Sequence, residues 1–356
     1  MLDLAVAFIL AAILGFSAQR ASVCTVRAVA EILSSRSASI LISFVKAAIW
    51  ALPISVLVLW TDFWRVLPAV TYPVSLSALL GGGLFGIGAA TNGACAFSTL
   101  AYFAEGKLPM LASFVGYLLG VRIWERIQAT PILRLPLPTH SLLMQPTSTS
   151  MALFGLICAW ILYEGRKLWR GCDRQQSWRE LLLAERYRLS TAAMIIGICA
   201  GILYALSGAW TYSSVLRGLA LSHTDTSYQQ GSAPILLLAM FAGMVVSAWQ
   251  LGRIHLHWRG AGEWLRRLIG GTLMGFGASL VPGGNDEIIL RAFPLLSPHA
   301  LPAFLGVLLG IACGLWVLKL TTRRVLHVVC VGDYFKENWL ADVGANQDPR
   351  RPRSSD

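Results

Sequence analysis

Long apolar runs separated by short polar segments constrain this sequence more than any other feature. About nine such runs occur, near residues 2–20, 39–60, 74–93, 109–127, 150–164, 188–207, 234–251, 266–281 and 299–319. A helix needs roughly 17 to 25 mostly apolar residues to cross the hydrocarbon core of a bilayer. Because no soluble fold requires nine runs of this kind, the sequence predicts an all-α, polytopic membrane protein.

Composition argues against the alternative, which is a very apolar soluble enzyme. The 356 residues are 56% hydrophobic and 13% charged, whereas soluble domains are about a quarter charged. The first run lacks a basic leading segment and a clean cleavage site, so we interpret it as a retained span rather than a signal peptide. The seven cysteines form no CxxC pair and no zinc-like spacing with histidine, so no metal and no other cofactor is expected.

The basic residues predict the orientation of the chain in the membrane. They gather in the loops after the fifth and seventh runs and in the tail after the ninth, whereas the segments after the sixth and eighth runs hold only Arg217 and Arg291. Under the positive-inside rule the three basic segments face the cytoplasm. We therefore predict that the N-terminus lies outside the membrane and the C-terminus in the cytoplasm. Scattered in this way, the net charge of +11 does not predict binding to nucleic acid.

Two phrases occur twice in the chain. GIGAATNGACAFSTL at 86–100 is echoed by GFGASLVPGGNDEIIL at 275–290, and GFSAQRASVCTVRAVAE at 15–31 by ALSGAWTYSSVLRGLA at 205–220. In the first pair Gly284 stands where Cys95 stood; in the second, aligning Arg27 with Arg217 places Cys24 on Ser214. We predict two repeats, over 1–127 and 188–322, of which the second is inverted because a single span connects them. That span and a basic loop occupy 128–187, and a polar cytoplasmic tail occupies 323–356.

Each repeated phrase leads into a stretch too short to span a membrane, at 25–35, 96–105, 214–222 and 287–293. Half-helices at membrane depth must be buried in protein or line a cavity, because lipid cannot satisfy their free backbone groups. Their N-terminal amides would favour an anion. Ordinary close helix packing through Gly and Ala is the other reading of such phrases. Two pairs at matched positions favour a transport pathway.

The residues that could carry the chemistry lie at these interruptions. The thiols of Cys24 and Cys95 are weak, soft donors that suit a polarisable sulfur atom, although small buried cysteines also occur for packing alone. Charged groups near membrane depth are functional candidates by default. The predicted pathway residues are Cys24, Cys95, Gly284, Asn285, Arg27, Arg217 and Ser214, with Asp286, Glu287, Arg291 and Asn92 as secondary candidates. Asp286 and Glu287 could cap a half-helix, pair with Arg291 or titrate during transport.

The phrases QRASVCTVRA, GIGAATNGACAFSTL and GFGASLVPGGND resemble the signatures of the YeeE/YedE family of sulphur-transport proteins, over nearly the whole chain. The resemblance implies a protein of the bacterial inner membrane that takes up thiosulfate, with pathway cysteines that hydrogen-bond the anion and relay it without covalent transfer. Cys24 and Cys95 match two of these positions, whereas Gly284 replaces the third. That departure puts thiosulfate itself in question, and leaves transport as the expected class.

Three function classes follow. The favoured one is a permease, not an enzyme, for a small sulfur-containing anion. The second is a channel or transporter for another small solute, such as a selenium compound or another oxyanion. The third is a membrane redox protein that uses Cys24 and Cys95 as a pair. The expected partners are the anion and the lipid bilayer. The basic loop after the fifth run could dock a cytoplasmic sulfur-carrier protein, and it is equally consistent with a solvated linker.

Overall fold

In the computed structural model, the described residues are 2–61, 70–128, 139, 141, 143, 145–170, 184–208, 210–221, 232–258, 260–281, 283–322, 324–331 and 333–341. Cys172 and most of the basic loop that contains it lie outside them. Within the described residues, the long helices coincide with the apolar runs predicted from the sequence: α1 (Leu2–Ala21), α3 (Ser39–Trp60), α4 (Leu76–Asn92), α6 (Met110–Gln128), α7 (Ser148–Arg170), α9 (Leu189–Ser207), α11 (Ala233–Gln250), α12 (Ala261–Leu280) and α14 (Ala300–Thr322).

Seven segments of the described chain are long and apolar enough to cross a membrane. The helices α6 and α12 are not among them, because each carries charged residues near one end: Arg122, Glu125 and Arg126 on α6, and Glu263, Arg266 and Arg267 on α12. Large apolar side chains on the outer faces of the long helices are exposed, among them Phe8, Leu119, Leu156, Leu238 and Leu309. The chain is therefore a multi-pass helical membrane protein.

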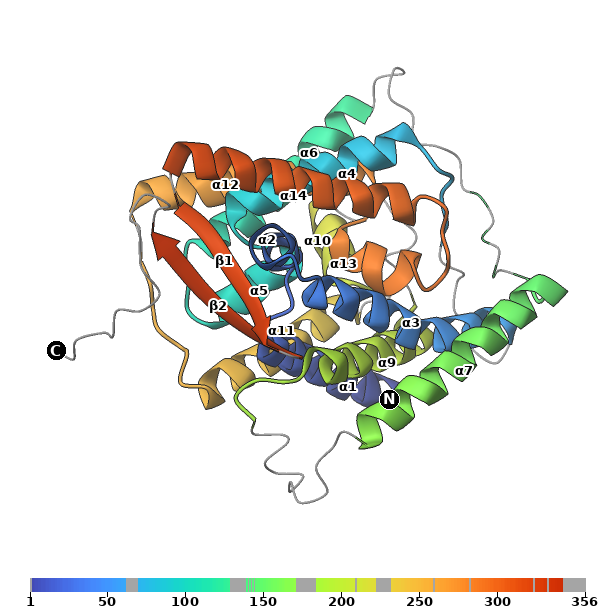
Figure 1. Ribbon diagram of the computed structural model, residues 1–356. Coiled ribbons are helices and arrows are strands. Elements are labelled where there is room, and N and C mark those ends of the chain that lie inside the picture. Colours follow the sequence, from blue (N-terminus) through green and yellow to red (C-terminus); the bar gives the residue numbers. More distant parts are fainter. Residues whose placement is uncertain are drawn as a thin grey trace.

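The long helices other than α7 form two layers, with short helices between them (Figure 1), and α7 packs on α3. One layer holds α4, α6, α12 and α14, in which α4 packs on α12 and α14, and α12 also packs on α6. The other holds α1, α3, α9 and α11, in which α1 packs on α9 and α11, and α3 packs on α9. Glycine permits the closest approaches: a Cβ at Gly86 on α4 would lie 2.3 Å from the backbone oxygen of Val307 on α14.

Short helices fill the space between the two layers (Figure 1). They are α2 (Thr25–Ser35), α5 (Ala96–Ala104), α10 (Tyr212–Leu221) and α13 (Asn285–Glu287), and α13 continues as a π-helical turn, η2 (Ile288–Ala292). The predicted short stretches at 25–35, 96–105, 214–222 and 287–293 thus fall on these helices, although α10 and α13 begin two residues earlier than expected.

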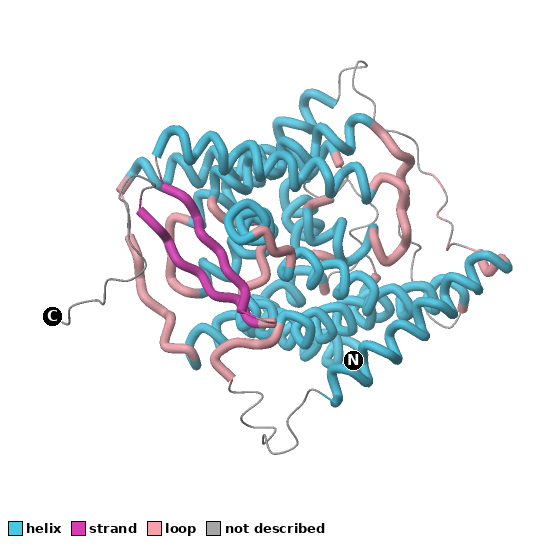
Figure 2. Tube along the Cα trace, in the orientation of Figure 1, coloured by secondary structure: helices cyan, strands magenta, loops and turns pink. Residues whose placement is uncertain are grey.

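A two-stranded antiparallel hairpin, β1 (Arg324–Val331) and β2 (Tyr334–Ala341), follows α14 and is drawn in magenta in Figure 2. The sequence reading expected an all-α fold with a polar tail here, and missed these strands. Their signal is the β-branched run VLHVVCV followed by YFKENWL, residue types that favour strands. The hairpin lies against the C-terminal end of α2, where Ser34 Oγ donates to the oxygen of Val328 (3.0 Å) and accepts from its N–H (3.2 Å).

Candidate functional site

Cys24 and Cys95 come together between the two layers. Cys24 directly precedes α2 and Cys95 directly precedes α5, so the first turns of two short helices meet here. The two thiols hydrogen-bond each other, both side chains are 1% exposed, and neither forms a disulfide. The sequence reading placed these cysteines on one pathway, and they are neighbours in the fold although 71 residues apart in the chain (95 − 24).

The first turns of α2 and α5 supply donors to the sulfur of Cys95. The backbone N–H groups of Thr25 and Ser98 donate to Cys95 Sγ, and Ser98 Oγ lies 3.5 Å from the same sulfur. Ser98 Oγ also donates to the oxygen of Val23 (3.1 Å), which fixes the loop before α2. Free N–H groups at a helix start carry partial positive charge. The site therefore offers thiols and amides together, a set of donors suited to an anion with a polarisable atom.

A glycine turn explains why Cys95 lies at the start of a new helix. The helix α4 ends at Asn92, and Gly93 adopts φ 75°, a left-handed conformation that glycine reaches without a Cβ penalty. Asn92 Nδ2 donates to the oxygen of Ala94 (3.0 Å) and to Thr99 Oγ1 (2.8 Å). Asn92, a secondary candidate from the sequence, thus holds the turn in place and does not line either of the cavities described below.

Asn285 links the second half of the chain to the cysteines. Its Nδ2 donates to Thr25 Oγ1 (2.8 Å), which ties α13 to the start of α2. Its Oδ1 is buried and has no hydrogen-bond partner among the described residues. Asn285 and Cys95 line one cavity together with Phe97, Asp286 and Leu290, called here the Cys95 cavity.

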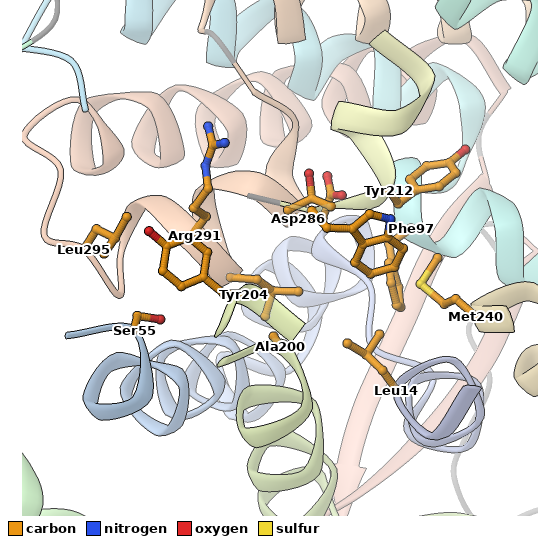
Figure 3. A pocket seen from close by; sticks show the side chains of 13 residues that line it. Leu14, Ser55, Phe97, Ala200, Tyr204, Tyr212, Met240, Asp286, Arg291 and Leu295 are labelled. Atoms are coloured by element: carbon orange, nitrogen blue, oxygen red, sulfur yellow. The ribbon is translucent and has the colours of Figure 1, made fainter. Parts of the chain in front are cut away.

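A second cavity shares three lining residues with the first: Phe97, Asp286 and Leu290. This Arg291 cavity is lined also by Tyr204, Thr211 and Arg291. Figure 3 shows Asp286 between Arg291 and Tyr212, with Phe97 close by. Asp286 and Phe97 therefore stand where the two cavities adjoin.

Asp286 and Glu287 have different partners, although they are adjacent in the chain. Asp286 Oδ2 accepts from the backbone N–H of Ser213 (2.9 Å), in the first turn of α10. Glu287 forms a salt bridge with Arg291, one turn along. Both carboxylates are buried, 3% and 6% exposed. The sequence left both roles open for these two residues. In the structure Asp286 caps the neighbouring helix α10, and Glu287 pairs with Arg291.

The two arginines at matching positions of the repeated phrases, Arg27 and Arg217, lie on different short helices. Arg27 on α2 donates to the oxygen of Ser22 (3.2 Å) and to the hydroxyl of Tyr102 on α5 (2.6 Å), next to Cys24. Arg217 on α10 lies near Tyr117, as do Asp286 and Glu287. Arg27 therefore lies near the thiols, whereas Arg217 lies near the same tyrosine as the two carboxylates.

Ser213, and not the predicted Ser214, lies against Gly284. Ser214 Oγ accepts from the N–H of Thr211 (2.9 Å) and donates to its oxygen (2.7 Å), so it caps its own helix. Ser213 Oγ accepts from the N–H of Gly284 (3.3 Å) and also hydrogen-bonds Tyr117. A Cβ at Gly284 would lie 2.7 Å from Ser213 Oγ. Sequence alignment through Arg27 and Arg217 missed Ser213 and Tyr117, because helix α10 begins before the aligned position.

A search of curated proteins finds no match to this chain. A family model described as Sulphur transport matches residues 20–313, a range that holds all four short helices and the eleven residues singled out from the sequence. Membership in a transport family also indicates a transporter rather than an enzyme. The chain belongs to the sulphur transport (YeeE/YedE) family.

Proposed function

We propose that this protein is a permease for a small sulfur-containing anion, which passes Cys24 and Cys95 by hydrogen bonding without covalent transfer. One observation carries the proposal: two buried thiols are in contact at the starts of two short helices, and one of them, Cys95, lines a cavity. Thiols and helix-start amides can desolvate an anion while replacing its hydration. Membership in the sulphur transport family supports the same substrate class.

The pathway would run between two inverted repeats, α1–α6 and α9–α14. Helix packing supports this symmetry, because each contact has a counterpart: α1 with α11 matches α9 with α3, and α4 with α14 matches α12 with α6. The two remaining contacts, α1 with α9 and α4 with α12, join equivalent helices. The short helices would then be re-entrant, which agrees with their position between the layers (Figure 1).

The proposed orientation is N-terminus outside and C-terminus in the cytoplasm. Contacts among the basic segments support it, since they lie at one end of the bundle. Arg20 at the end of α1 donates to the oxygen of Ala184, in the basic loop before α9, and to Gln250 Oε1 (2.5 Å) at the end of α11. The hairpin reaches the same end, where Leu189 N–H donates to the oxygen of Asp333 (2.8 Å). A reporter fused after the hairpin should be active in the cytoplasm, and activity only in the periplasm would contradict this topology.

Substrate preference within this class depends on the place where Gly284 removes a thiol. The neighbouring donors there are the amide of Asn285, the backbone N–H of Gly284 and the hydroxyl of Ser213. Nitrogen and hydroxyl donors favour oxygen atoms over polarisable sulfur. This observation favours a second candidate, in which an oxyanion such as sulfite or selenite is carried better than thiosulfate.

Uptake by cells that express this chain alone tests both candidates. Labelled thiosulfate, sulfite and selenite are offered separately and then in competition, to native protein and to a Cys24→Ala/Cys95→Ala variant at matched expression. Uptake that depends on the two thiols supports a permease, and the order of the three anions decides between the candidates. Undiminished uptake by the double variant would reject the thiol pathway. A disulfide between the two cysteines in the working protein would favour the redox alternative.

A further inference from the structure

Asp286 stands at the boundary between the Cys95 cavity and the Arg291 cavity. It lines both of them, together with Phe97 and Leu290, and its side chain is 3% exposed. Any anion that moves from one cavity to the other must therefore pass this carboxyl group. An ionised carboxylate at that point would repel the anion strongly, because the surroundings are apolar and screen charge poorly.

The hydrogen bonding of Asp286 is incomplete. Oδ2 accepts from the N–H of Ser213 (2.9 Å), and the carboxylate also hydrogen-bonds the side chain of Ser213. Oδ1 is buried and has no partner that meets normal hydrogen-bond geometry among the described residues. The nearest basic side chain on the same segment, Arg291, forms its ion pair with Glu287. A buried carboxylate that lacks its own cation favours the protonated form, in which Oδ1 can become a donor.

Other titratable or charged groups surround Asp286. Those on its own segment are Glu287 and Arg291; those on the packed elements are Tyr117 on α6, Tyr212 and Arg217 on α10, Tyr204 on α9 and Cys95 before α5. The remaining residues that line the two cavities on α1, α3 and α11, such as Leu14, Ser55 and Met240, have no titratable side chain. Among these groups, Asp286 alone is a carboxyl without an ion pair to a described cation.

We propose that Asp286 is the proton-accepting group of the pathway, so that the anion is carried together with a proton. This inference rests on the proposed function. The carboxylate of Asp286 takes up one proton from the Arg291 cavity, which removes its negative charge, and the anion then passes Phe97 towards Cys95. Release of that proton on the cytoplasmic side restores the carboxylate. No bond other than the O–H bond is formed or broken.

The test compares native protein with Asp286→Asn in proteoliposomes. An asparagine retains an oxygen that can accept from the N–H of Ser213 and resembles the protonated acid in shape. Native uptake should fall roughly tenfold for each pH unit above the pKa of a single required acid, and should acidify a pH dye trapped inside the vesicles. Asp286→Asn should transport at a rate that no longer depends on pH, without acidification.

Glu31→Gln on α2 is the matched control, because it removes a buried carboxylate that lines neither cavity and should leave proton movement intact. Proton movement that persists in Asp286→Asn, or native uptake without any proton movement, would overturn the inference and leave the permease standing. Absence of uptake for every anion would instead reject the permease. In that case an infrared titration of the purified protein still decides the question. A protonated-acid C=O band that titrates in native protein and is missing in Asp286→Asn supports the assignment, and its absence from native protein refutes it.

Discussion

Cys95 and Gly284 stand at the starts of two short helices with nearly the same backbone. Cys95 has φ −71° and ψ 171°, and Gly284 has φ −78° and ψ 179°. The side chains around them differ: Cys95 is surrounded by a second thiol and two helix-start amides, whereas Gly284 is surrounded by the hydroxyl of Ser213 and the carboxylate of Asp286. A shared backbone can therefore present soft donors in one half and hard, titratable groups in the other.

The difference lies in the neighbouring helix as much as in the missing thiol. Ser213 on α10 fills the space that a side chain at position 284 would need, and its N–H is held by Asp286. On the other side, the N–H of Thr25 at the start of α2 donates to Cys95. In both halves a short helix directs an amide at the start of its partner helix. The two halves differ in the atom that accepts this amide hydrogen bond, which is the sulfur of Cys95 in one and a carboxylate oxygen of Asp286 in the other.

Among the variants considered, single cysteine substitutions should lower the uptake rate most strongly. Cys24→Ala or Cys95→Ala removes a buried donor to a charged substrate, and we expect uptake to fall about 10- to 100-fold. Cys313→Ala and Cys158→Ala are the matched controls, because Cys313 is exposed and Cys158 half-buried, both on long helices away from the cavities. The measurement is initial uptake rate at equal surface expression. Equal losses in all four variants would show that these thiols act through folding alone.

A thiol introduced at position 284 should have the next largest effect, but only when space is made for it. In Gly284→Cys the new Cβ would lie 2.7 Å from Ser213 Cβ and Oγ and 2.8 Å from Asp286 Oδ1. Overpacking of this kind costs about 1–3 kcal/mol of stability. We therefore expect the single variant to be less stable in detergent, with reduced uptake of every anion.

The double variant Ser213→Gly/Gly284→Cys removes that obstruction. It should recover stability and raise thiosulfate uptake relative to sulfite, since a soft donor then replaces a hydroxyl at the same place. Ser213→Gly alone is the control for the lost hydroxyl. A double variant that folds normally and keeps the native ratio of thiosulfate to sulfite would show that this position does not select the substrate.

Sequence patterns predicted the helices well, because length and apolarity decide membrane spans. The short helices were also predictable, since repeated Gly-rich phrases marked where the long helices end. The proximity of Cys24 to Cys95 followed from the same repeats. In contrast, the pairing of Glu287 with Arg291, and the position of Ser213 against Gly284, depend on where α10 and α13 begin. Those starts are set by capping contacts such as that between Thr211 and Ser214, which an alignment of arginines does not reveal.

A third difference between the halves concerns acid stability and should be the smallest effect. His299 directly precedes α14, whereas Pro109, which cannot titrate, directly precedes α6. Burial lowers the pKa of His299 from 6.5 to about 4, helped by the nearby positive charge of Arg291. Its Nδ1 shares a hydrogen bond with Ser297 Oγ (2.7 Å).

Because the pKa of His299 is lower in the folded protein than in the unfolded chain, the unfolded chain gains a proton first as the pH falls. Stability should therefore be unaffected above about pH 6.5 and decrease by up to about 3 kcal/mol between there and about pH 4. His299→Asn should remove much of this loss, and the exposed His257→Asn should not. The measurement is the apparent Tm in detergent from about pH 8 to pH 4; parallel curves for native protein and His299→Asn would assign the acid sensitivity to other groups.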